Sequence, residues 1–168
     1  MTVTPAVLAA VIVGLVILLA YAQTANAQEF DSGDLTVSTN QFSDKVRYFA
    51  RAIASAEGYG IPNAIPTLAN NPGDLVIPGW TGATLGAEGI SVLDADDLNN
   101  PLPPNGGWYR LFHQLQFIVD GTSRVYNLDM SIEQMAERWT DTQTDAWASN
   151  VATYLGTTPG ATLRSQLT

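Results

Sequence analysis

Apolar side chains recur with a helical period between residues 41 and 57. Those three or four positions apart form one face, which consists of Val46, Phe49, Ala50 and Ile53. Asn40 stands where the N-cap of this helix is expected. Gly58 and Gly60 follow the last turn, and glycine supplies the left-handed backbone that commonly ends a helix. The pattern therefore predicts an amphipathic helix that ends at Glu57.

Glu57 is the informative residue of this helix because it continues the apolar face. At about 100° per residue it projects close to Val46 and Ala50. A carboxyl on that side is shielded from water, which raises its pKa toward the range that a general acid needs near neutral pH. The alternative is a surface Glu that swings into solvent at the helix end, where the helix dipole disfavours a negative charge. Both interpretations stay open on spacing alone.

The pattern changes between residues 74 and 93, where two short β-like runs flank a Gly-rich stretch. The runs are residues 75–77 and 90–93, and Trp80 lies between them. This arrangement predicts a small irregular hairpin. The acidic stretch 94–97 that follows lacks the ligand spacing of an EF-hand, so we interpret it as a solvated loop and predict no metal site.

From Trp108 the apolar pattern is again helical. It keeps a 3.6-residue period from Leu115 to Tyr126, straight through Gly121. One helix is therefore predicted across this glycine. His113 lies near its start, where we expect a capping or surface role rather than chemistry.

Two further helices are predicted after it. The first starts at the capping-box pattern of residues 131–134, and its core face comprises Ile132, Met135, Ala136 and Trp139. The second follows a break at residues 141–145 and is stopped by Gly156. Trp139 and Trp147 have the helical spacing of core residues, so we assign both to packing.

The N-terminal region differs from the rest of the chain. The run at residues 5–22 carries no charged side chain, and as a helix it is about 27 Å long, close to the thickness of a bilayer core. We predict a transmembrane anchor over residues 1–22. A cleaved signal peptide is the alternative, since residues 25–27 read Ala-Asn-Ala, although no basic residue precedes this motif. A polar linker over residues 23–40 and one folded domain over residues 41–168 complete the predicted organisation.

Composition narrows the class of function. The 168 residues carry a formal net charge of −9, which disfavours an interaction with nucleic acid. There is no cysteine, so disulfides and thiolate metal sites are excluded. The single histidine excludes a multi-histidine zinc site and argues against a Ser-His-Asp hydrolase. We expect neither a metal nor an organic cofactor.

Two segments of the folded domain together resemble a known group of enzymes. Ala-Glu-Gly-Tyr at residues 56–59 is followed by Ala-Asn-Asn-Pro-Gly-Asp-Leu at residues 69–75 and then by the predicted hairpin. The chain is similar here to the lysozyme-like muralytic superfamily, and in particular to its soluble-lytic-transglycosylase-like and phage-encoded members. Residues 136–140, 147–151 and 155–156 also resemble that branch, and the similar parts together cover roughly residues 44–160.

The resemblance implies a mainly α-helical, lysozyme-like α+β fold with a small β-hairpin beside a cleft. It also implies that Glu57 protonates the glycosidic oxygen between N-acetylmuramic acid and N-acetylglucosamine. In relatives without a second carboxylate, the same Glu then acts as base, and the muramyl 6-hydroxyl attacks C1 to leave a 1,6-anhydro product. In relatives that have a second acid, water is the nucleophile and the enzyme is a hydrolase.

The residues that could provide a second carboxylate are Asp74, Glu88, Asp94 and Asp96. Asp74 follows a Pro-Gly turn, where an Asp is commonly a turn or capping residue. Glu88 lies in the Gly-rich hairpin, where it could reach the cleft or be exposed. None of the four is a clear partner for Glu57, which favours a lytic transglycosylase over a hydrolase.

Six residues, Glu88 again among them, are candidates for substrate binding: Tyr59, Asn70, Asn71, Trp80, Glu88 and Tyr126. The aromatic rings could stack on sugars, although core packing is the commoner role of an aromatic side chain. Asn70 and Asn71 could donate hydrogen bonds to N-acetyl groups or could fix their own loop.

The expected partners are peptidoglycan glycan strands and, through residues 5–22, a lipid bilayer. A membrane-anchored muralytic domain fits a phage virion protein that opens the cell wall during entry, and it equally fits a bacterial envelope enzyme. Other virion or envelope proteins are further candidate partners. The alternative function is a non-catalytic structural or binding protein on a lysozyme-like fold, since a fold does not determine an activity. Glu57 separates the two functions, because only the enzyme needs a carboxyl there.

Overall fold

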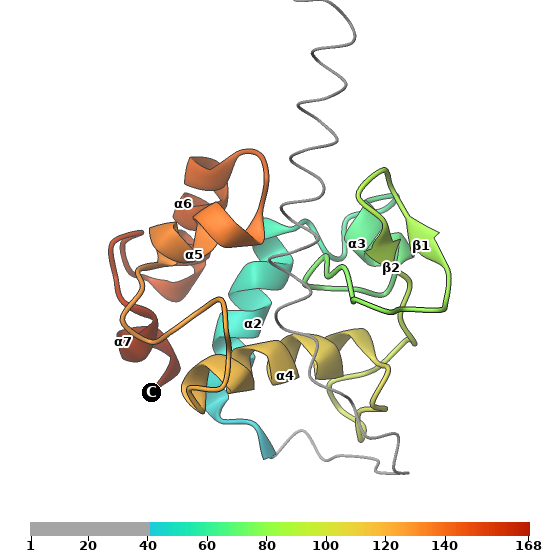
Figure 1. The fold of residues 1–168 in the computed structure, drawn as a ribbon, viewed down its shortest axis with the longest axis horizontal. Helices are drawn as coiled ribbons and strands as arrows, with labels where there is room; N and C mark the ends of the chain where they lie inside the picture. The colour runs from blue at the N-terminus through green and yellow to red at the C-terminus, as the bar shows by residue number, and fades with distance from the viewer. Residues whose placement is uncertain (1–40) are drawn as a thin grey trace, which may run out of the picture.

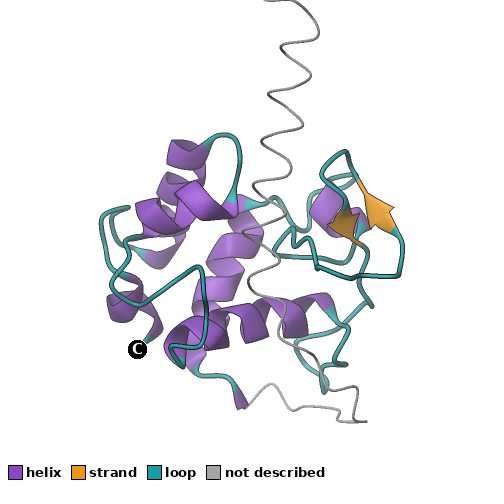
Figure 2. Ribbon diagram, viewed as in Figure 1, coloured by secondary structure: helices purple, strands orange, loops and turns teal. Residues whose placement is uncertain are grey.

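The computed structural model describes residues 41–168 as a mainly helical domain with a small antiparallel hairpin (Figures 1 and 2). The helices in this part of the chain are α2 (Asp44–Ala56), α3 (Ile65–Leu68), α4 (Gly107–Val119), α5 (Ile132–Trp139), α6 (Thr144–Leu155) and α7 (Leu163–Leu167). The strands are β1 (Thr84–Leu85) and β2 (Ile90–Ser91). The prediction of a helical domain with a small hairpin is confirmed at this level.

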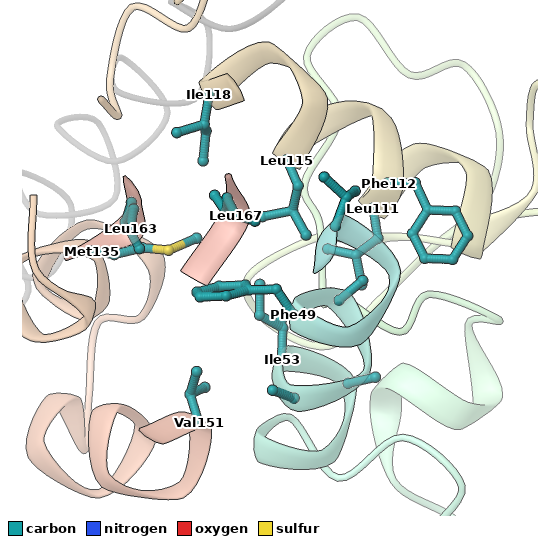
Figure 3. Close-up of a cluster of buried hydrophobic side chains, with 14 of the residues drawn as sticks. Phe49, Ile53, Leu111, Phe112, Leu115, Ile118, Met135, Val151, Leu163 and Leu167 are labelled. Atoms are coloured by element: carbon teal, nitrogen blue, oxygen red, sulfur yellow. The ribbon is translucent and has the colours of Figure 1, made fainter. Parts of the chain in front are cut away.

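Helix α2 is the centre of the domain and packs against α4, α6 and α7. Figure 1 shows α5, α6 and α7 on one side of it, and α3 with the hairpin on the other. The core between the helices consists of fully buried aliphatic and aromatic side chains (Figure 3), which include Phe49, Ile53, Leu111, Phe112, Leu115, Ile118, Met135, Val151, Leu163 and Leu167. Each such side chain contributes about 2 kcal/mol through removal from water. The core therefore fixes α2, and with it the position of its C-terminal end.

Both ends of α2 have a local explanation in the sequence. The Ser43 side chain accepts a hydrogen bond from the Val46 amide at 3.2 Å, so Ser43 is the N-cap and not the predicted Asn40, which lies outside the described residues. At the other end Glu57 is the C-cap, and Gly58 follows with a φ of +81°. That left-handed conformation suits glycine and ends the helix as predicted.

The predicted helix through Gly121 is wrong, because α4 ends at Val119. Gly121 has a φ of +69°, and the amides of Thr122 and Ser123 both donate to the carbonyl of Phe117 at 3.0 Å. These bonds close the helix in the manner of a glycine C-terminal motif. The apolar period continues past Gly121 because the following loop also buries residues such as Tyr126, which is 7% exposed.

The hairpin is shorter and shifted relative to the prediction. Its register pairs Thr84 with Ser91 and Leu85 with Ile90, so residues 75–77 form no strand. That segment is instead attached to β2, since the Ser91 amide donates to the Leu75 carbonyl at 3.1 Å. A serine hydroxyl, rather than a strand ladder, accepts the Ile77 amide at 3.0 Å. The alternation of apolar and polar residues predicts a backbone partner for the Ile77 amide. It does not show that the Ser91 hydroxyl takes that place.

The C-terminal helices follow their sequence signals. The Ser131 hydroxyl and the Gln134 side chain form both bonds of a capping box at the start of α5. Helix α6 ends at Leu155, and its C-cap is Gly156, whose φ is +69°. The predicted anchor and linker, residues 1–22 and 23–40, lie outside the described residues. No helix within residues 41–168 is long and apolar enough to span a bilayer.

Candidate active site

Glu57 lies where three parts of the domain meet, at the C-terminal end of α2. Trp139, the last residue of α5, donates its indole N–H to Glu57 Oε1 at 3.0 Å. Trp147, in the first turn of α6, donates to the same oxygen at 2.7 Å. The side chain is thus held by both indoles, and Glu57 is only partly exposed at the helix end.

The environment of Glu57 raises its pKa from 4.5 to about 7. Burial is the largest cause, since it penalises the charged form. The negative charge of Asp74 raises the pKa further, whereas the hydrogen bonds from Trp147 and Trp139 lower it. Burial dominates this balance, and Glu57 therefore keeps a proton up to neutral pH. This is the property that general-acid catalysis requires.

The turn at residues 70–75 places Asp74 near Glu57. Its centre is Asn71, which is fully buried. The Asn71 amide group donates to the carbonyls of Leu75 at 2.8 Å and Ser91 at 3.0 Å, and its oxygen accepts from the Leu75 amide at 2.9 Å. Asn71 therefore fixes its own loop against β2, which is one of the two roles considered from the sequence.

Asp74 itself is held in an uncommon conformation. Its φ is +51°, in the left-handed region where non-glycine residues are infrequent. Its Oδ1 atom is buried and has no hydrogen-bond partner among the described residues. Burial and the neighbouring Glu88 carboxylate raise the Asp74 pKa from 3.8 to about 6. Strained backbone and an unpaired buried acceptor both tend to occur at functional sites.

The carboxyls of Glu57, Asp74 and Glu88 act on one another in turn: the charge of Glu88 raises the pKa of Asp74, and the charge of Asp74 raises the pKa of Glu57. Asp74, with the lower pKa, ionises while Glu57 is still neutral, and Glu57 then titrates in the field of the Asp74 anion. Asp141, in the loop between α5 and α6, also has a raised pKa, first through burial and then through Glu88. Neither of the two ion pairs within residues 41–168 involves these carboxyls. The interacting carboxyls therefore come from four segments: the end of α2, the 70–75 turn, the hairpin and the α5–α6 loop.

Two of the other second-carboxylate candidates have structural roles. Asp96 accepts hydrogen bonds from the amides of Trp108 and Tyr109 at 3.1 Å, so it caps the start of α4. Asp94 has an exposed side chain, and its backbone bridges to Gly106. Of the four candidates, Asp74 raises the pKa of Glu57 directly, and Glu88 raises the pKa of Asp74.

The remaining predicted binding residues are distributed around this site. Asn70 is partly buried and donates to the Leu93 carbonyl at 3.4 Å. Tyr59, two residues after Glu57, is partly exposed and packs edge-on against Trp108, with ring centroids 5.4 Å apart. Trp80 is partly exposed in the loop before β1, where its indole N–H donates to the Ala83 carbonyl at 3.1 Å.

Tyr126 and His113 lie in packed surroundings. Tyr126 is buried, its hydroxyl donates to the Arg138 carbonyl at 3.1 Å, and its ring lies 5.8 Å from that of Trp139. It packs against Trp139 and, being buried, presents no open face to a sugar. The His113 ring contacts the rings of Phe42, Tyr109 and Phe117, so it packs at the edge of the core, in the middle of α4 rather than near its start.

Trp139 and Trp147 have a second role that helical spacing does not reveal. Trp147 is 5% exposed and Trp139 partly buried, as expected for packing residues, but both also bind Glu57. The available signal was chemical, since a buried indole N–H needs an acceptor. Within the described residues no group of His, Cys, Asp and Glu side chains could hold a metal ion.

Comparisons with known proteins assign no family to this chain. No family model matches it, and neither the curated proteins nor the solved structures provide a match.

Proposed function

We propose that this protein is a peptidoglycan-degrading lytic transglycosylase with Glu57 as its acid and base. The observation that carries the proposal is a carboxyl held by two indole N–H groups, in buried surroundings that raise its pKa to about 7. Such a group can protonate a glycosidic oxygen at neutral pH, which an ordinary Glu cannot. The resemblance of residues 56–59 and 69–75 to muralytic enzymes supplies the substrate class.

In this mechanism Glu57 gives its proton to the glycosidic oxygen between the two amino sugars as the bond to C1 breaks. The resulting carboxylate then takes the proton of the muramyl 6-hydroxyl as that oxygen bonds to C1. The proton count balances, the product has a 1,6-anhydro end, and Glu57 returns to its neutral state. The partly exposed Tyr59 and Trp80 are the candidates for stacking on the sugar rings.

One observation favours hydrolysis as the second candidate outcome. Asp74 is a second carboxyl close enough to Glu57 for its charge to raise the Glu57 pKa. A carboxylate on the other side of the sugar could activate water, which would leave a reducing end instead of an anhydro end. The product therefore discriminates the two enzymes.

We further propose that the enzyme acts from a membrane, in a phage virion or a bacterial envelope. The uncharged run at residues 5–22 supports this setting. Recovery of the chain from purified virions supports the phage setting, whereas its detection only in uninfected cell envelopes excludes it.

The test is digestion of purified peptidoglycan by the full-length chain, with muropeptides identified by mass spectrometry. Anhydro-ended products from the wild type, and none from Glu57→Gln, are expected. Glu133→Gln is a matched control, because it removes an exposed carboxyl on α5. Reducing ends would mean a hydrolase. No cleavage by the folded wild type would favour the non-catalytic structural or binding protein.

A further inference from the structure

Two indole N–H groups converge on a single oxygen of Glu57. The donor–acceptor distances to Oε1 are 3.0 Å from Trp139 and 2.7 Å from Trp147. An indole nitrogen donates and cannot accept. Oε1 must therefore act as an acceptor toward both rings, whether Glu57 is neutral or ionised.

This geometry makes the two carboxyl oxygens of Glu57 inequivalent. In a neutral carboxyl the carbonyl oxygen is the better acceptor, and the proton resides on the other oxygen. We propose that Trp139 and Trp147 are positioning residues that fix Oε1 as the acceptor and leave Oε2 as the oxygen that delivers and recovers the proton. The role of Oε2 in proton transfer rests on the proposed function. The role of Oε1 as acceptor of both indole hydrogen bonds does not.

The surroundings hold both indoles in place. The ring centroids of Trp139 and Trp147 lie 6.0 Å apart, and the ring of Tyr126 also packs against Trp139, at 5.8 Å. The Tyr126 hydroxyl is tied to the Arg138 carbonyl. Gln143, the residue before α6, has a φ of +58°, and its carbonyl accepts the Trp147 amide at 2.9 Å. The ring contact between Trp139 and Trp147 joins α5 to α6, and the other contacts hold each end of this junction, so both donors are aimed at Glu57 before any substrate binds.

The pair also matters at the moment when Glu57 loses its proton. As the Oε2–H bond breaks, negative charge spreads over both oxygens, and the two N–H bonds to Oε1 become charge-assisted and stronger. They thus stabilise the carboxylate more than the neutral acid, which is the differential stabilisation that lowers a barrier. Burial works in the opposite direction and keeps the proton on the resting enzyme.

The experiment separates the N–H groups from the bulk of the rings. Trp139 and Trp147 are replaced one at a time in the full-length chain, by Phe and by benzothienylalanine, which keeps the shape of tryptophan but has no N–H. The Glu57 pKa is measured by carbon NMR of the side-chain carboxyl, whose signal is identified by its absence in Glu57→Gln. Trp108→Phe is the control, because its indole is not a Glu57 partner.

Each replacement should raise the Glu57 pKa, and Trp147 should have the larger effect. The turnover number on peptidoglycan should fall roughly tenfold to a hundredfold, the loss of one hydrogen bond to a charged group, with little change in KM. A Glu57 pKa that does not change would overturn the proposal. So would a raised pKa with an unchanged turnover number, since the rings would then be structural.

Failure of the proposed function would look different. If the wild type does not cleave peptidoglycan but the replacements still raise the Glu57 pKa, the hydrogen bonds are confirmed and the catalytic role falls with the enzyme assignment. If the wild type cleaves and the pKa does not change, the enzyme assignment stands and the positioning role of the tryptophans is refuted.

Discussion

Substitution of Glu57 by Gln should stabilise the folded protein at high pH while abolishing the proposed activity. Glu57 has a pKa of about 7 in the folded chain, against an ordinary value of 4.5. At about 1.4 kcal/mol per pKa unit, its ionisation costs the folded state about 3 kcal/mol. Gln stays neutral, and its amide oxygen can still accept from the indoles of Trp139 and Trp147.

The sign follows from proton linkage. Below a pH of about 4.5, Glu57 is neutral in both the folded and the unfolded chain. As the pH rises, the unfolded chain releases the proton first, so the free energy of unfolding of the wild type falls until the folded pKa of about 7 is passed. Glu57→Gln lacks this loss. Its advantage over the wild type should thus be about 3 kcal/mol larger at pH 8.5 than at pH 4.

Urea unfolding of the full-length chain, followed by near-ultraviolet circular dichroism at several pH values, measures this difference. Glu133→Gln controls for the removal of one carboxyl at an exposed position of α5. A Glu57→Gln curve parallel to that of the wild type between pH 4 and 8.5 would refute the reasoning, because it would mean that Glu57 ionises with its ordinary pKa.

Three further substitutions test the surroundings of Glu57. Asp74→Asn removes the charge that raises the Glu57 pKa, so that pKa should fall in an NMR titration, while Asp141→Asn, which neighbours Glu88, serves as control. Asn71→Ala leaves buried backbone partners unpaired and should lower the free energy of unfolding by about 3 kcal/mol in urea unfolding; a loss under 1 kcal/mol would contradict the central role of that side chain. Gly107→Ala directs a methyl group into the Asn70 carbonyl and should cost about 1–3 kcal/mol and reduce peptidoglycan cleavage, whereas Gly160→Ala, with open space around it, should do neither.

Local signals in the sequence predicted the position of Glu57 and the helices around it. The apolar face of α2 fixes which side of the helix enters the core, and Glu57 continues that face. Gly156 and the capping box at Ser131 act within one helical turn. The helix ends that they form can therefore be predicted from the sequence without knowledge of the tertiary contacts. The helical period of the apolar residues did not show that α4 ends before Gly121, because the loop after Gly121 also buries apolar side chains such as Tyr126.

The chemistry of the site depends on contacts between distant segments. Trp139 and Trp147 are 82 and 90 residues from Glu57, and helical spacing says only that their rings are buried. The direction of an indole N–H depends on how α5 and α6 meet. The coupling between Asp74 and Glu88 similarly depends on how the 70–75 turn lies against the hairpin. A single sequence carries no direct record of either arrangement.

The most direct test of the account is the pH dependence of peptidoglycan cleavage, measured beside the NMR pKa of Glu57 in the same full-length protein. If Glu57 is the acid, kcat/KM should fall above a pH of about 7, at the pKa that NMR reports for its carboxyl. Asp74→Asn should move both values down together. Cleavage that persists in Glu57→Gln, or that falls at a pH unrelated to the Glu57 pKa, would contradict the central claim.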